Sequence, residues 1–419
     1  MRRLRSMHVA LFAVMVALSS SAAVAGDIDK QNFRQIERGR YLTIVGDCAA
    51  CHTLPGSGRD LAGGRPIETP FGNILAPNIT PDQQTGIGAW TDSEFVDAMT
   101  KGTGRNGTHL YPAMPYTYYS KVTRDDALAI RAYLNTVPAV QNPVNPNQLP
   151  FLFNIRASMS FWNKLFFTPG TFEPATDKSE EWNRGAYLAE GLGHCGLCHT
   201  PKNLLGGDKE SERLQGYALQ GWFASDITSD PRRGIGSWSV DEIVAYLKTG
   251  HSRTSAANGP MSETLNLSTS HMTDADLKAI ATYLKDPPVR NENQNQNVSA
   301  APDQTVMKVG AKIYADECSG CHMANGKGSA NLFPALDGSA VIQQADATSL
   351  LHIVLRGARS VATDRAPTGP AMPEFGWLLK DDEVAAVVTY IRNSWGNAAA
   401  SVSAAEVGKA RHAFVERSD

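Results

Sequence analysis

All six cysteines of this 419-residue chain belong to three copies of one motif, Cys-x-x-Cys-His, at residues 48–52, 195–199 and 318–322. The motif is the attachment signature of a c-type haem, because two thiols on one turn each bond a vinyl group while the following histidine binds the iron. Zinc sites and thioredoxin-like redox pairs also use Cys-x-x-Cys. Three copies that all end in histidine, with no cysteine left over, favour three covalently bound haems. The predicted cofactor-binding residues are Cys48, Cys51, Cys195, Cys198, Cys318 and Cys321, and the predicted proximal iron ligands are His52, His199 and His322.

Three methionines recur in register with these motifs. Met114 and Met261 each lie 62 residues after the motif histidine, and Met372 lies 50 residues after the third. Each has a proline nearby, which favours an irregular loop that holds the thioether rigidly. We therefore predict Met114, Met261 and Met372 as the distal iron ligands. Histidine–methionine ligation leaves no open site on the iron and is typical of electron transfer rather than oxygen or peroxide chemistry.

Other side chains compete for the distal position. Met272 aligns with Val122 of the first copy and is expected to pack at a helix start, and Met323 directly follows a proximal histidine and cannot reach the opposite face. His109 and His251 precede the candidate methionines by five and ten residues, so bis-histidine ligation remains open for the first two haems.

One residue around the ligands can also be predicted. Pro334 follows His322 by twelve residues, and its carbonyl can accept the imidazole N–H and fix the orientation of the ring.

Trp90 and Trp238 occupy equivalent places in the first two copies. Their indole N–H groups either reach a haem propionate or belong to side chains that only pack in the core.

The elements around each motif repeat as well. A helical segment with a glycine, Gly39, Gly185 or Gly310, precedes each motif, and an amphipathic segment closes each copy near residues 128–134, 277–284 and 384–391. The glycine lets the second helix cross closely, with an aromatic side chain filling the contact. The pattern predicts a mostly α fold of three tandem class I cytochrome c domains, each with one covalent haem.

A middle helix is also predicted in each copy. Capping boxes at residues 91–94 and 239–242 start this helix in the first two copies. Glycines at positions 102, 250 and 357 are placed to end it as C-terminal caps.

The sequence resembles the trihaem cytochrome c subunits of bacterial membrane-bound dehydrogenases, a group that serves alcohol, gluconate, sorbitol and FAD-dependent glucose dehydrogenases. The blocks that carry the resemblance are residues 46–53, 78–82, 111–116, 181–188 and 395–397. The resemblance implies a non-catalytic subunit that relays electrons from a dehydrogenase catalytic subunit, a flavoprotein or quinoprotein oxidising a sugar, sugar acid or alcohol. It implies ubiquinone or a terminal oxidase as the acceptor. A freely diffusing periplasmic multihaem carrier and a multihaem peroxidase are the alternatives, and a peroxidase needs one five-coordinate iron.

The N-terminus indicates export. Residues 1–25 read as a signal peptide, with three arginines, an apolar stretch at 8–18 and a small-residue cleavage site at 23–25. About ten apolar residues are too few to span a bilayer. The predicted location is the periplasm, at the outer face of the cytoplasmic membrane. Loss of three of the 39 basic residues against 42 acidic ones moves the formal charge from -3 to -6, which argues against nucleic-acid binding.

Composition divides the mature chain further. We predict a first domain at 26–140, a second at 179–288 and a third at 305–396, with an aromatic linker at 141–178 and a polar linker at 289–304. The alanine-rich tail at 397–419 is predicted as a marginal helix or a frayed end. In the aromatic linker, Phe151, Ile155, Met159, Trp162 and Phe166 fall on one helical face. This face either lies in a membrane interface, which gives peripheral attachment, or packs between the first two domains.

Overall fold

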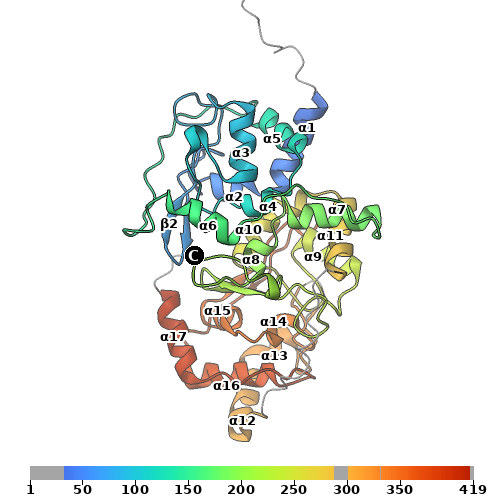
Figure 1. The fold of residues 1–419 in the computed structure, drawn as a ribbon. Helices are drawn as coiled ribbons and strands as arrows, with labels where there is room; N and C mark the ends of the chain where they lie inside the picture. The colour runs from blue at the N-terminus through green and yellow to red at the C-terminus, as the bar shows by residue number, and fades with distance from the viewer. Residues whose placement is uncertain (1–32, 287–300, 331, 416–419) are drawn as a thin grey trace, which may run out of the picture.

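Three helical units follow one another along the molecule in the computed structural model, which describes residues 33–286, 301–330 and 332–415 (Figure 1). We call them the N-terminal unit (33–140), the middle unit (179–286) and the C-terminal unit (301–415). The predicted signal peptide and most of the predicted polar linker lie outside the described residues. Within the described part, the named strands form three two-stranded antiparallel sheets.

The N-terminal and middle units have their α-helices and strands in the same order and differ in where their short 3-10 helices lie. The N-terminal unit contains α1 (Phe33–Val45), α2 (Cys48–His52), β1 (Pro66–Thr69), β2 (Gly72–Leu75), α3 (Asp92–Lys101), η2 (Arg105–Gly107), α4 (Tyr116–Tyr119) and α5 (Arg124–Leu134). The middle unit contains α7 (Glu180–Glu190), α8 (Gly196–His199), η3 (Glu210–Glu212), β3 (Tyr217–Leu219), β4 (Trp222–Ala224), α9 (Val240–Thr249), α10 (Pro260–Leu267), η4 (Thr269–His271) and α11 (Asp274–Lys285).

The C-terminal unit departs from this pattern between its motif and its closing helices. It contains α12 (Gln304–Ile313), the π-helical turn η6 (Tyr314–Cys318), α13 (Ser319–His322), α14 (Ala340–Gln343), α15 (Thr348–Arg356), β5 (Ala358–Arg359), β6 (Ala371–Met372), α16 (Asp381–Arg392) and α17 (Ala404–Val415). A further helix, α6 (Ser158–Phe166), lies in the segment between the first two units.

In each unit the helix before the motif crosses the closing helix at a glycine. A Cβ atom added at Gly39 would lie 1.8 Å from the carbonyl oxygen of Ala129, and one at Gly185 would lie 1.9 Å from that of Ala279. At Gly310 the corresponding distance, to Ala386, is 2.2 Å. Only glycine allows this approach. The predicted close crossing is confirmed in all three copies, with the tyrosine of the second helix as the nearest side chain: Tyr133, Tyr283 and Tyr390.

The predicted caps of the middle helix are also confirmed in the first two units. The Thr91 and Ser239 side chains each accept a hydrogen bond from the third helical N–H, and the glutamate there bonds back to the cap. Gly102 and Gly250 end α3 and α9 in the left-handed conformation. Gly357 ends α15 differently: its φ is 74° but its ψ is -179°, because the chain turns there into β5.

The N-terminal and middle units share one hydrophobic core, to which α1, α5, α7 and α11 contribute. The C-terminal unit has its own core, built on α15, α16 and α17. A small third cluster joins the last two units, where Val361 packs against Ala257 and Leu265.

The C-terminal tail forms the helix that its alanine-rich sequence allows, but the prediction of a frayed end is wrong for its described part. Residues 404–415 form α17, which buries Val407 and Phe414 against the C-terminal core. Arg411 donates to Asp381 at 2.8 Å and to the carbonyl of Leu379 at 2.9 Å. The weakly amphipathic sequence hides this docking, because two apolar residues seven positions apart and one arginine provide most of it.

The aromatic linker is partly packed against the middle unit and partly exposed to solvent. The indole N–H of Trp162 donates to the carbonyl of Leu205 at 2.8 Å, and Phe166 packs on Gly207, so this face of α6 lies on the middle unit. Asn163 accepts a hydrogen bond from Tyr116 at 2.7 Å. The prediction of one helical face from 151 to 166 is wrong, because α6 begins only at Ser158. Phe151 and Ile155 lie before it and remain exposed.

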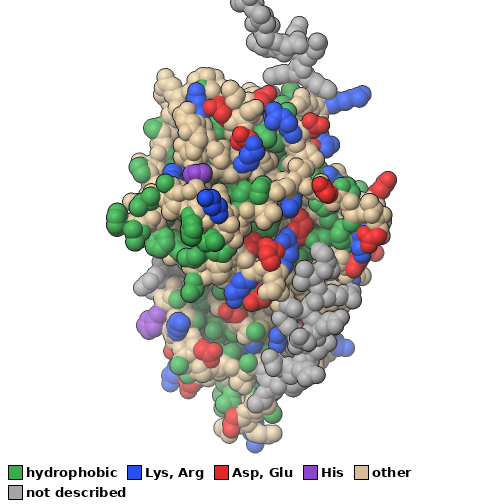
Figure 2. All heavy atoms as spheres, in the orientation of Figure 1, with side chains coloured by type: hydrophobic (Ala, Val, Ile, Leu, Met, Phe, Trp, Pro, Cys, Tyr) green, Lys and Arg blue, Asp and Glu red, His purple; other side chains and the backbone are tan. Residues whose placement is uncertain are grey.

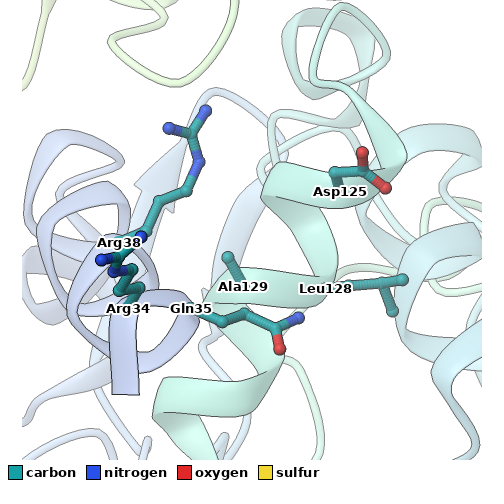
Figure 3. Close-up of a pocket in the computed structure, with 6 residues that line it drawn as sticks. All are labelled: Arg34, Gln35, Arg38, Asp125, Leu128 and Ala129. Carbon is teal, nitrogen blue, oxygen red and sulfur yellow. The ribbon is translucent and has the colours of Figure 1, made fainter. Parts of the chain in front are cut away.

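No helix in the described part of the chain is both long and apolar enough to cross a membrane. One surface hollow of about 310 Å³ lies between α1 and α5. Figure 3 shows its lining, which includes Arg34, Arg38 and Asp125 and none of the motif residues, so it is not a haem site.

Candidate haem-binding sites

Each of the three motif histidines is held by the same kind of hydrogen bond. Nδ1 of His52 lies 2.7 Å from the carbonyl oxygen of Pro77, that of His199 lies 2.6 Å from Ser225, and that of His322 lies 3.2 Å from Pro334. A carbonyl can only accept, so Nδ1 carries the proton and Nε2 keeps its lone pair. A metal-binding histidine needs this tautomer, oriented from behind by a hydrogen bond.

The acceptor predicted for the third motif, Pro334, is therefore confirmed, whereas Pro77 and Ser225 were missed. They lie 25 and 26 residues after their histidines. Each comes directly before a repeated stretch, residues 78–80 and 226–228, that has an isoleucine and a threonine at matching positions. That repetition was a usable signal, but only the fold shows that its preceding carbonyl faces the imidazole.

A glycine fixes the chain around each histidine from the other side. The N–H groups of Gly63, Gly216 and Gly328 donate to the carbonyls of His52, His199 and His322 at 2.7, 2.8 and 3.1 Å. All three glycines have positive φ, at 73°, 90° and 60°. At Gly63 a Cβ would lie 2.4 Å from the carbonyl carbon of Pro77, so this glycine allows the loop after His52 to approach the segment that carries the acceptor carbonyl.

The motif cysteines do not have the environment of a thioredoxin-like redox pair. Burial raises the pKa of the Cys48 and Cys51 thiols to about 12 and that of Cys195 and Cys318 to about 11. Neutral thiols do not suit a thioredoxin-like nucleophile. The described residues contain no group of three or more histidine, cysteine or acidic side chains that could hold a metal ion. A zinc site needs about four such ligands, so neither alternative finds support.

The candidate distal methionines lie in three different local structures. Met114 is in a turn just before α4, Met261 is the second residue of α10, and Met372 is in the short strand β6. The prediction of a loop without regular helix is therefore wrong for Met261, whereas Met372 lies outside any helix. Pro260 occupies the first position of α10, where the fixed φ of proline starts a helix rather than preventing one. All three side chains are half-buried.

The competing methionines occupy the places expected of them. Met272 is 2% exposed in the shared core and immediately precedes the helix cap Thr273, as Val122 precedes Thr123. Met323 is 41% exposed, and its backbone carbonyl accepts the Tyr314 hydroxyl at 2.7 Å. Both positions agree with packing roles.

The two histidines that compete for the distal position, His109 and His251, each have a buried ring nitrogen. Nδ1 of His109 and Nε2 of His251 are buried and have no hydrogen-bond partner within the described part of the chain. His109 pairs with Thr103 and His251 with Ala256 in isolated bridges, so both lie at the turn that follows the middle helix. Buried polar atoms without partners are uncommon and call for a ligand, an ion or a water.

The two tryptophans pack against the shared core. Trp238 is buried and makes an edge-to-face contact with Tyr246 at 5.4 Å between ring centroids, and Trp90 is half-buried. The residues present fit covalently bound c-type haem, because paired thiols and an imidazole oriented by a backbone carbonyl recur in each unit. This is the residue set of a c-type cytochrome.

Comparison with known proteins gives the family. The cytochrome c family model matches residues 36–138 and 307–395. The chain is 38% identical to the gluconate 2-dehydrogenase cytochrome c subunit of Pantoea cypripedii over 97% of its length and 95% of that protein. It is 38% identical to the fructose dehydrogenase cytochrome subunit of Gluconobacter japonicus, over 90% and 82% of the two chains.

A third relative is the cytochrome c subunit of the alcohol dehydrogenase (quinone) of Gluconobacter oxydans (strain 621H). The two proteins are 36% identical over 95% of this chain and 86% of the relative. The chain belongs to the family of cytochrome c subunits of dehydrogenases, and its role is electron transfer.

Proposed function

We propose that this protein is a relay of three covalently bound haems, one in each helical unit, and that each unit is a class I cytochrome c domain. The observation that supports this most directly is the threefold recurrence of an imidazole whose Nδ1 faces a backbone carbonyl. A covalently held haem iron with two protein ligands accepts and donates single electrons. The chain's own residues hold and orient that group and exclude water around it.

Met114, Met261 and Met372 are the proposed distal ligands. Replacing each by leucine should leave the haem attached, because the cysteines and the proximal histidine are untouched. One potential should fall, and one iron should become able to bind carbon monoxide. His109→Ala and His251→Ala test the alternative that the unpartnered imidazoles are ligands. If they open an iron while Met114→Leu and Met261→Leu do not, the first two haems have bis-histidine ligation.

The number of haems has its own test. A pyridine haemochrome assay against protein mass should return three haems per chain. A value of one or two contradicts the three-haem proposal. Carbon monoxide that binds the reduced native protein would indicate a five-coordinate iron and favour the peroxidase alternative.

The proposed partner is a dehydrogenase catalytic subunit, a flavoprotein or quinoprotein, that oxidises a sugar, a sugar acid or an alcohol. Ubiquinone or a terminal oxidase is the proposed acceptor. The names of the three relatives support this, since each is a cytochrome subunit of a dehydrogenase. Purification from a detergent extract should yield a large flavin- or quinone-containing subunit together with the cytochrome. Isolation of the cytochrome alone from fresh extract would favour a freely diffusing carrier.

The proposed location is the periplasmic face of the cytoplasmic membrane. An exposed apolar band supports it, formed by Phe151, Leu152, Phe153, Ile155, Phe161, Leu165, Leu204 and Leu205. Figure 2 shows hydrophobic side chains gathered at the side of the molecule where Figure 1 places α6. Contiguous apolar surface of this kind marks an interaction site.

A lipid surface is the occupant that we propose for this band. Residues 140–172 contain Arg156 and Lys164 and no aspartate or glutamate, in a chain whose formal charge is -3. Apolar side chains flanked by cations suit an anionic membrane interface. Leu204 is 97% exposed in the loop next to α6 and is placed to insert with them.

Vesicle flotation tests this proposal. The holoprotein should float with phosphatidylglycerol vesicles, more weakly at high salt, and Phe161→Glu with Leu165→Glu should abolish flotation while the haem spectra stay normal. Trp377→Glu with Leu378→Glu is the matched control, since these side chains are also exposed but lie outside the band. Equal flotation of both double variants, or none by the native protein, would contradict lipid docking.

A further inference from the structure

The N-terminal and middle units contact each other through a reciprocal pair of hydrogen bonds. The hydroxyl of Tyr41 on α1 donates to Asp276 on α11 at 2.6 Å, and the hydroxyl of Tyr187 on α7 donates to Asp126 on α5 at 2.6 Å. The two tyrosines are equivalent in the repeat, as are the two aspartates. The two units therefore meet as a pseudo-symmetric pair within one chain.

The helix that carries the second proposed distal ligand lies on the first haem motif. Two residues after Met261, the Glu263 carboxylate accepts from Arg65 of the N-terminal unit, with Nη2 and Oε2 2.9 Å apart. The same guanidinium donates through Nη1 to the carbonyl of Ala50, between the two cysteines of the first motif. Arg65 thus joins the attachment turn of one unit to the methionine helix of the other.

The opposite contact is also present. Helix α4 begins two residues after Met114, and its Tyr118 lies against the second motif, where a Cβ at Gly196 would be 2.8 Å from the Tyr118 hydroxyl. The hydroxyl of Tyr118 donates to Asp208, which forms an ion pair at 2.5 Å with Lys202. The ammonium of Lys202 donates to the carbonyl of Gly196, inside the second motif, at 3.2 Å. Each methionine segment therefore packs on the attachment turn of the other unit.

We propose that this arrangement makes the first two haems a coupled redox pair, with Arg65 and Glu263 as positioning residues whose charges and contacts set both potentials. The inference rests on the three-haem function proposed above. A nearby cation favours the reduced form of a haem because reduction removes one positive charge, and a nearby anion favours the oxidised form. Among the described residues, no side chain of the C-terminal unit joins the Arg65–Glu263 pair or the Tyr118–Asp208–Lys202 contacts. The contacts of this unit with the middle unit include Ser349 with Phe223 and a ring stack between Trp222 and His352.

Equilibrium redox titration of the purified holoprotein tests the proposal without any partner. Met114→Leu, Met261→Leu and Met372→Leu first assign the three steps of the titration. Arg65→Gln should then lower the potentials of the first and second haems, and Glu263→Gln should raise them. The third haem should not move in either variant. The surface pair of Arg365 with Asp274, 3.0 Å apart between the last two units, supplies the control Arg365→Gln.

The outcomes separate coupling from simple structural support. Opposite shifts in Arg65→Gln and Glu263→Gln, each at two haems, support the proposal, because loss of a merely structural contact would lower the melting temperature in both without opposite signs. A shift confined to one haem, or none, overturns it. If Arg65→Gln does not fold, the near-isosteric Glu263→Gln carries the test alone. Failure here leaves the three-haem relay intact, since haem counting tests that separately.

Discussion

Gly63 offers a sharp test of how the proximal histidine is held. Its N–H donates to the carbonyl of His52 at 2.7 Å, and its φ is 73°. In Gly63→Ala the new Cβ would lie 2.4 Å from the carbonyl carbon of Pro77, where ordinary contact begins at 3.4 Å. The chain must therefore separate there by about 1 Å. The carbonyl that moves is the one that orients His52.

Two energy terms add in this variant. The left-handed backbone conformation costs an L-residue about 1 kcal/mol, and overpacking costs about 1–3 kcal/mol. We expect Gly63→Ala to lower the free energy of unfolding by about 3 kcal/mol. A longer hydrogen bond from Nδ1 of His52 to the Pro77 carbonyl makes the imidazole a weaker electron donor to the iron. The potential of the first haem should therefore rise.

Gly56 is the matched control, because its φ is 72° and a Cβ there would meet nothing within 4 Å. Gly56→Ala should show only the cost of the left-handed backbone conformation, so the free energies of unfolding of the two variants should differ by about 2 kcal/mol. For the N-terminal and middle units, which share one core, this is roughly 4–8 °C in melting temperature. Thermal unfolding followed at the haem absorption band, with a redox titration, measures both effects. Equal melting temperatures and an unchanged first potential in Gly63→Ala would refute the reasoning.

Three further predictions concern other parts of the chain. Gly185→Ala should destabilise the shared core by about 1–2 kcal/mol in thermal unfolding, because overpacking against Ala279 exceeds the helix-propensity gain; Gly170→Ala, in the linker where a Cβ meets nothing within 4 Å, should be nearly neutral. Burial raises the pKa of Asp47 to about 8, above the unfolded value near 3.9, so the folded chain binds the extra proton and stability should fall as pH rises from about 4 to about 8. Asp47→Asn should remove that slope in melting curves at about pH 5, 7 and 9, and an unchanged slope would contradict a raised pKa at Asp47. Arg411→Ala should cost about 1–3 kcal/mol and expose α17 to limited proteolysis, whereas native-like resistance would mean that the apolar contacts suffice.

Several features followed from the sequence because their causes are local. Haem attachment needs two thiols and an imidazole within five residues. Cys48, Cys51 and His52 therefore predict this chemistry without knowledge of the fold. Helix caps are equally local, and the capping boxes at Thr91 and Ser239 formed where predicted. The glycine crossings were predictable because the same residue recurs at the same distance before all three motifs.

The tertiary structure decided what depends on distant parts of the chain. Pro77 faces His52 from 25 residues away, and Glu263 reaches Arg65 across 198 residues. Periodicity placed Trp162 on an apolar stripe, but only the loop at Leu205 shows that it packs while Phe161 stays in solvent. Local patterns reflect backbone sterics and short-range hydrogen bonds, whereas these contacts depend on how three similar units pack, which no single segment encodes.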